Sequence, residues 1–161
     1  MSERKSAELI DREASLLLVV DMQEKLGPKI SGIEALTARN RALIDAATLL
    51  RVPVVFTEQY PKGLGHTDPD LLAAAPDGDV IEKIHFDASA ENGTMEVIES
   101  HRRRQIVVTG TEAHVCVLQT AIGLHGQGLD VRLVSDATGS RRAADKSEAI
   151  ARLRAVGVGC V

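Results

Sequence analysis

"QIVVTGTEAHVCVLQTAIGLHGQGLDVRLVS", residues 105–135, contains the unit from which the fold of the whole chain can be predicted. It opens with one apolar run, Gln105–Gly110, and closes with another, Asp130–Ser135, and a segment with helical spacing follows Glu112. Near-continuous apolar runs that lack polar alternation are typical of strands covered on both faces. The stretch therefore predicts a strand, a helix and a second, parallel strand.

Similar apolar runs recur outside this stretch, at Leu16–Val20, Val52–Thr57, Asp79–Ile84 and Val156–Val161. Segments with helical character separate the runs, and they lie at 32–50, 69–75, 91–104, after 112, and at 146–156. Strands that alternate with helices form right-handed βαβ units, and 161 residues fit a single core. We therefore expect one domain, residues 1–161, folded as an α/β three-layer doubly wound sandwich with a mostly parallel six-stranded sheet.

Two details of this pattern carry further expectations. Asn40 falls on the apolar stripe of the first helix, and a buried amide needs partners, so we expect it to form hydrogen bonds with a neighbouring loop rather than with a ligand. The last apolar run ends with the chain at Val161. We expect part of the sheet beside it to be exposed or covered by a partner subunit, which favours a homo-oligomer.

Composition and charge exclude several classes of protein. The formal net charge of −4 and the pI near 5.7 do not favour nucleic-acid binding. No apolar stretch approaches the roughly 18 to 20 residues that span a bilayer, and the charged N-terminus is unlike a signal peptide. Two cysteines, Cys116 and Cys160, are too few for a disulfide framework. We expect a cytoplasmic protein that binds neither nucleic acid nor membranes.

Three reactive residue types stand at or near predicted strand ends. Asp21 follows the first run, Lys83 lies in the third, and Cys116 follows the fourth. Because ligands of open α/β sheets bind at the carboxyl ends of the strands, these side chains are expected to converge. A cysteine in the first turn of a helix, near an ammonium group, has a lowered thiol pKa. Asp21 would then accept the thiol proton, Lys83 would hold the ion pair, and backbone N–H groups would receive an oxyanion.

Each of these residues also has a plainer interpretation. Cys116 is compatible with a buried packing residue, Asp21 with a helix cap, and Lys83 with a solvent-facing side chain on an edge strand. A Cys–His pair would need His66 or His85, because His114 is two residues from Cys116 and residues two apart on a helix do not face each other. No spacing selects either histidine. Metal ligation by the loop residues His66, Asp68 and Asp70 lacks a dedicated spacing.

The chain resembles the isochorismatase-like cysteine hydrolases in Asp21-Met22-Gln23, in Lys83, and most specifically in "GTEAHVCVLQTA" after the fourth run. "TEQYPKGLG" and "SDATGSR" extend the likeness. The resemblance implies a catalytic triad of Asp21, Lys83 and Cys116, and a covalent thiol intermediate on a small amide or related substrate. It also implies a non-proline cis peptide at Thr111-Glu112, which would aim the N–H groups of Glu112 and Cys116 at the oxyanion.

The resemblance is to the branch with unassigned substrates. The nicotinamidase branch carries an Asp-x-His metal site where this chain has Glu58-Gln59-Tyr60-Pro61, so neither a metal nor another cofactor is expected. The leading hypothesis is a hydrolase of a small C–N bond, with a small-molecule substrate. The alternatives are a non-catalytic scaffold or oligomerisation protein, and a thiol-redox sensor at Cys116. The residues expected to line the substrate pocket are Gln23, Phe56, Tyr60, Phe86 and His114, and Phe56 is equally compatible with a place in the core.

Overall fold

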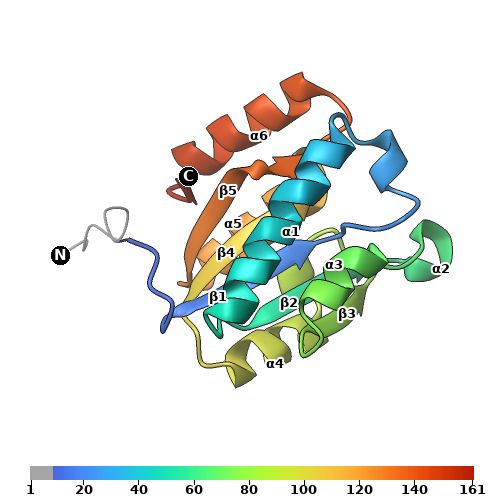
Figure 1. The fold of residues 1–161 in the computed structure, drawn as a ribbon. Coiled ribbons are helices and arrows are strands. Elements are labelled where there is room, and N and C mark those ends of the chain that lie inside the picture. The colour runs from blue at the N-terminus through green and yellow to red at the C-terminus, as the bar shows by residue number, and fades with distance from the viewer. Residues whose placement is uncertain (1–8) are drawn as a thin grey trace.

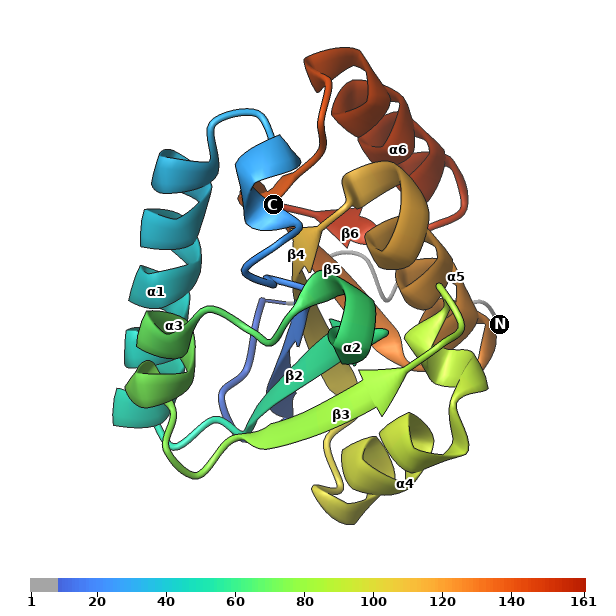
Figure 2. The same cartoon turned by 90° about the vertical axis from the view of Figure 1, so that its right-hand side faces the viewer.

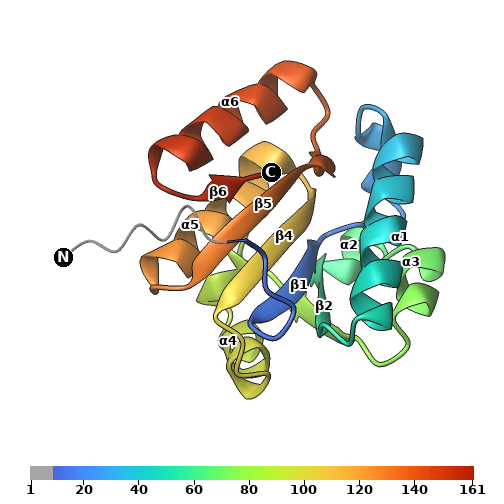
Figure 3. The same cartoon turned by 60° about the vertical axis from the view of Figure 1, so that its left-hand side comes forward.

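The computed structural model describes residues 9–161, and within them six strands form one parallel sheet in the order β3-β2-β1-β4-β5-β6 (Figure 1). The order reverses between β1 and β4, so the switch point of the sheet lies between these two strands. Figure 3 shows β5, β4, β1 and β2 side by side. The strands are β1 (Ser15–Val20), β2 (Val54–Gln59), β3 (Asp79–Lys83), β4 (Gln105–Thr111), β5 (Asp130–Gly139) and β6 (Gly159–Cys160).

Helices cover both faces of the sheet. Helices α1 and α3 lie on one face, and α4, α5 and α6 lie on the other (Figure 2). The predicted three-layer α/β sandwich is therefore confirmed, and the sheet is parallel throughout. The helices are α1 (Ile33–Leu49), α2 (Pro61–Leu64), α3 (Pro69–Ala74), α4 (Asn92–Ser100), α5 (Leu118–Gly126) and α6 (Ala143–Ala155), with the short helices η2 (Gly27–Lys29), η3 (Ala88–Ala90) and η4 (Ala113–Val117).

Alternation along β1 explains the two layers of core. Leu17 and Val19 pack in the cluster that includes Ile44 of α1, whereas Leu16 and Leu18 pack in the cluster beneath α4, α5 and α6. Successive side chains of a strand point to opposite faces, so a strand buried on both sides is apolar at most positions. This is why the strongest runs in the sequence mark the central strands.

The structure corrects several details of the sequence prediction. Strand β5 runs on to Gly139 through a register irregularity opposite Val108 and Gly110, whereas the apolar pattern stops at Ser135. The final run contributes only the two residues of β6. The predicted long loop after β2 contains the short helix α2, which begins at Pro61, a residue whose fixed φ suits a first helical turn.

Asn40 is fully buried, and its amide donates to the carbonyls of Leu36 (3.0 Å) and Ala137 (2.9 Å). The expectation that it forms hydrogen bonds within the protein is confirmed, but the partner across the layer is strand β5 and not a loop. Within residues 9–161, no helix combines the length and the apolar character needed to cross a membrane.

Candidate active site

Strand register brings the acid and the ammonium group together. Val20 pairs with Thr57 of β2, and Gln59 pairs with Lys83 of β3, so the residues that end these three strands share one edge of the sheet. Asp21 follows β1 with a left-handed backbone (φ 49°). Lys83 Nζ lies 2.9 Å from Asp21 Oδ2, and both side chains have zero exposure. The solvent-facing interpretation of Lys83 is therefore wrong.

Hydrogen bonds from neighbouring strands fix this ion pair. Thr57 Oγ1 donates to Asp21 Oδ1 at 2.7 Å, which leaves Asp21 Oδ2 for the ammonium. Lys83 Nζ also donates to Gln59 Oε1 at 2.7 Å, and the carbonyls of His85 (3.2 Å) and Phe86 (3.5 Å) complete its surroundings. A buried ion pair is stable only when such additional bonds satisfy its remaining donors and acceptors.

Cys116 lies in a short π-helix, η4, directly before α5, and its side chain is buried within the apolar cluster under α4, α5 and α6. Both Asp21 and Lys83 lie close enough to its thiol to shift the thiol pKa. The acid, the ammonium group and the sulfur therefore meet, as the sequence predicts. Single-turn π-helices occur frequently at functional sites.

The expected lowering of the thiol pKa is wrong. Burial and the negative charge of Asp21 raise the pKa of Cys116 to about 12, and the opposing effect of Lys83 is smaller. Burial also raises the pKa of Asp21, although Lys83 and the hydrogen bond from Thr57 oppose the shift. The resting cysteine is thus a neutral thiol beside a carboxylate whose basicity is increased.

The segment upstream of the cysteine packs closely against β1. The Thr111-Glu112 peptide bond is cis, as the resemblance implies. Thr111 Oγ1 donates to the backbone carbonyl of Asp21 at 2.8 Å, which joins the end of β4 to the acid. Glu112 is buried, and its carboxylate accepts from Arg141 Nε at 2.9 Å and from Arg141 N at 3.2 Å.

Phe56, one of the residues predicted to line a pocket, belongs to the core, whereas Gln23 lines a cavity of about 310 Å³ together with Met22 and Thr111. Phe56 has zero exposure in the core between β2 and the α1 layer, so it cannot form the wall of an accessible pocket. The amide of Gln23 is buried, donates to the carbonyls of Gln59 (3.0 Å) and Gly65 (2.7 Å), and accepts from the Gln59 N–H (2.8 Å). Both amide hydrogens of Gln23 are therefore committed to backbone oxygens.

Tyr60 and Phe86, by contrast, are about half exposed, at 55% and 51%. Tyr60 lines a cavity of about 350 Å³ together with Lys83 and Ile84. His114 Nδ1 lies 3.0 Å from Ser140 Oγ, and its ring is near the carboxylates of Glu112 (4.0 Å) and Asp145 (3.9 Å). The cavity lined by Tyr60 therefore reaches Lys83, a member of the predicted triad.

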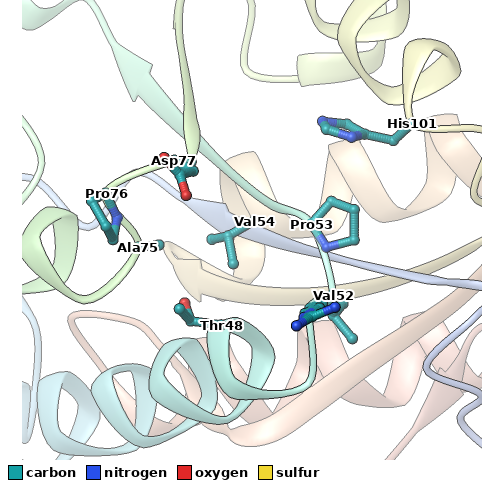
Figure 4. A pocket seen from close by; sticks show the side chains of 10 residues that line it. Thr48, Val52, Pro53, Val54, Ala75, Pro76, Asp77 and His101 are labelled. Atoms are coloured by element: carbon teal, nitrogen blue, oxygen red, sulfur yellow. The ribbon is translucent and has the colours of Figure 1, made fainter.

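Another cavity, of about 280 Å³, lies far from this chemistry. Its lining includes Val52, Pro53 and Val54, at the start of β2, and His101 after α4 (Figure 4). Asp21 and Lys83 lie at the carboxyl ends of β1 and β3, so this cavity belongs to the opposite end of the parallel sheet. Among the described side chains, no group of three or more His, Cys, Asp or Glu residues could hold a metal ion.

The sequence reasoning missed Thr57 and Gln59. Both lie in β2, which carries no member of the predicted triad, and neither residue type suggests chemistry by itself. The pairing of β2 with β1 and β3 places Thr57 on Asp21 and Gln59 on Lys83. A register prediction for the three strands is the signal that could have found them.

Comparison with known proteins assigns the chain to a family. The family model for the isochorismatase domain matches residues 15–161. Isochorismatase family protein 1A of Dictyostelium discoideum is 34% identical over 157 residues, covering 95% of this chain and 76% of that protein. The structure of the MAR1 ribonuclease from Caenorhabditis elegans has a TM-score of 0.88 and 37% identity, covering 94% of this chain and 78% of that chain.

The Escherichia coli YcaC gene product, described as an octameric hydrolase of unknown specificity, has a TM-score of 0.90 at 24% identity, over 94% of this chain and 76% of that chain. At that identity the likeness concerns the fold alone. The family match spans nearly the whole chain, and the curated relative is similar over most of its own length. The chain belongs to the isochorismatase family.

Proposed function

We propose that this protein is a cysteine hydrolase that cleaves a small amide or related C–N bond through a covalent thiol intermediate. Membership of the isochorismatase family indicates a hydrolase. The observation that supports the finer proposal is the fully buried contact between Lys83 and Asp21, with the Cys116 thiol close enough for both charges to shift its pKa. A nucleophile within hydrogen-bond reach of a base that a third group orients is the usual arrangement for covalent catalysis.

The first half-reaction begins when Cys116 Sγ bonds to the substrate carbonyl carbon and the thiol proton passes to the Asp21 carboxylate. The electron pair of the C–O double bond moves to oxygen and forms a tetrahedral oxyanion. When the C–N bond breaks, that pair returns, the amine leaves with the proton from Asp21, and a thioester remains on Cys116. The raised basicity of Asp21 favours this proton transfer, because a base works best when its pKa lies nearer the working pH.

The second half-reaction releases the acid. Water attacks the thioester carbonyl and gives a proton to Asp21, and the tetrahedral intermediate then expels the sulfur, which recovers that proton as the neutral thiol. Lys83 stays charged throughout and holds Asp21 in place at 2.9 Å. Its positive charge also stabilises the negative charge as that charge moves between carboxylate, sulfur and oxygen.

Hydrolysis of a panel of small amides tests the proposal. We expect wild type and Cys160→Ala to release amine at similar rates, and Cys116→Ala to be inactive. Cys160 is the matched control because it is the other free cysteine and lies in β6. If no amide is cleaved although Cys116 reacts with alkylating agents, a non-catalytic scaffold is favoured. Reversible oxidation of Cys116 without an acyl intermediate would favour the redox sensor.

We also propose that the protein is a homo-oligomer. A structural neighbour is described as octameric. Val80 in the edge strand β3 is exposed, and so is Ile84, the residue that directly follows this strand. Exposed apolar side chains on a sheet edge favour association with another chain. Light scattering coupled to size-exclusion chromatography is expected to give a mass that is a multiple of 17.2 kDa, and a monomer at micromolar concentration would refute this proposal.

A further inference from the structure

Gln59 is the side chain that shares the Lys83 ammonium group with Asp21. Its Oε1 accepts from Lys83 Nζ at 2.7 Å, slightly shorter than the 2.9 Å contact between Lys83 and Asp21. An ammonium group has three donors, and Asp21, Gln59 and the backbone carbonyls of His85 and Phe86 surround it. Lys83 is therefore held in one position from several sides and has no unused donor for a substrate.

The orientation of the Gln59 amide is fixed. Its Nε2 donates to the carbonyl of Ile84 at 2.9 Å, so the oxygen end must face Lys83. Its backbone is clamped in turn by Gln23, which accepts from the Gln59 N–H and donates to the Gln59 carbonyl. A glutamate at this position would place an oxygen against the Ile84 carbonyl and a second negative charge on the ammonium. The arrangement thus selects an uncharged acceptor.

We propose that Gln59 is a positioning residue that holds the Lys83 ammonium against Asp21 and thereby sets the reactivity of Cys116. The proposal rests on the proposed function in one respect, that Cys116 is the nucleophile. The hydrogen bonds of Gln59 go to Gln23, Ile84 and Lys83, so Gln59 acts on Cys116 through Lys83. Gln23 supports this role because its side chain fixes the backbone of Gln59.

The charges around the thiol give the direction of the effect. Lys83 favours the thiolate of Cys116, and Asp21 opposes it. Replacement of Gln59 by leucine removes one acceptor from the ammonium, so the cation is held less firmly beside the sulfur. Replacement by glutamate adds a carboxylate that competes with Asp21 for Lys83. Both changes make loss of the thiol proton of Cys116 less favourable. Glutamate closely matches glutamine in shape, so Gln59→Glu keeps the backbone contacts of β2.

Alkylation of Cys116 by iodoacetamide tests the proposal without a substrate. The rate is measured by peptide mass mapping between about pH 7 and pH 10, with Cys160 as an internal reference in the same sample. We expect Gln59→Leu and Gln59→Glu to slow alkylation of Cys116 by about tenfold at each pH, which corresponds to a displacement of about one pH unit. Gln127→Leu, the same change at an exposed glutamine after α5, is expected to change neither cysteine.

The sign of the change separates positioning from a merely structural role. Loosening of the site would expose the buried thiol and speed its alkylation, so faster or unchanged alkylation in both variants overturns the proposal. Slower alkylation of Cys116, with alkylation of Cys160 unchanged, supports the positioning role of Gln59. If the amide panel shows no hydrolysis alongside this result, only the proposed hydrolase function is refuted. Active hydrolysis through Cys116 with unaltered alkylation in both variants would defeat the positioning role alone.

Discussion

Replacement of Asp21 by asparagine should speed the alkylation of Cys116 by iodoacetamide and abolish amide hydrolysis. The carboxylate raises the thiol pKa, which burial has already raised, to about 12. Two unit charges about 4 Å apart interact by about 4 kcal/mol at an effective dielectric constant of about 20, which sets an upper limit of about three pKa units for the effect of Asp21, since burial is the larger cause of the rise. Asparagine removes this interaction but leaves the positive charge of Lys83, so the thiolate becomes the counter-ion of the ammonium.

The expected gain in alkylation follows from these numbers. A thiol pKa lower by about two to three units increases the thiolate fraction near neutral pH by about a hundredfold to a thousandfold, and the weaker nucleophilicity of a less basic thiolate cancels part of this gain. We predict that Asp21→Asn reacts with iodoacetamide about 10 to 100 times faster than wild type, and that it hydrolyses no amide, since its proton acceptor is gone.

Two controls make this test decisive. Asp136→Asn, at an exposed carboxylate of β5, is expected to behave as wild type. Addition of Lys83→Met to Asp21→Asn should abolish the gain, because the thiolate then lacks its cation. Loss of one partner of a buried ion pair costs about 3 to 5 kcal/mol, so thermal unfolding must first establish that each variant is folded. Alkylation that is unchanged or slower in folded Asp21→Asn would refute the electrostatic reasoning.

Three further predictions concern the fold. Gly110→Ala should yield no folded protein in expression and circular-dichroism trials. Gly110 has a φ of 108°, and a Cβ at this position would collide with the backbone of Val20. A folded variant would contradict this packing. Asn40→Ala should lower the free energy of unfolding in urea by about 1 to 3 kcal/mol, because the carbonyl of Ala137 loses its buried donor; a loss below about 0.5 kcal/mol would show that this bond is unimportant. Glu91→Gln should lower the free energy of unfolding at pH 7 by about 1 kcal/mol, a small amount because the Glu91 side chain is partly exposed. Hydrogen bonds lower the folded pKa of Glu91 to about 2, so this difference should vanish as the pH falls from about 4.5 towards 2. An equal difference in urea titrations at both ends of that pH range would refute the prediction.

Much of the fold follows from local pattern. A strand buried on both faces is apolar at most positions, so the central strands could be located from runs such as Leu16–Val20 and Gln105–Gly110. The end of β5 could not, because residues 136–139 pair with β4 only after a register irregularity that depends on the partner strand. The amphipathic stripe of α1 similarly predicted burial of Asn40 but not which element would accept its hydrogen bonds.

The candidate site shows where pattern stops being sufficient. The positions of Asp21, Lys83 and Cys116 at strand ends predicted that they meet, because topology alone brings those ends together. The sign of the thiol pKa shift was mispredicted, since it depends on how much apolar surface closes over the sulfur and on the competition between two nearby charges. The role of Gln59 depends on the register of β2 with β3, which composition does not encode.

The most direct test of a covalent role for the buried triad is intact-protein mass spectrometry after rapid acid quench. Small p-nitrophenyl esters serve as activated acyl donors, so that acylation outpaces release by water. We predict that wild type and Cys160→Ala gain the mass of one acyl group, located on the peptide that carries Cys116, and that the adduct decays as acid is released. Turnover of these donors with no adduct on Cys116, and at an undiminished rate in Cys116→Ala, would contradict the mechanism at its centre.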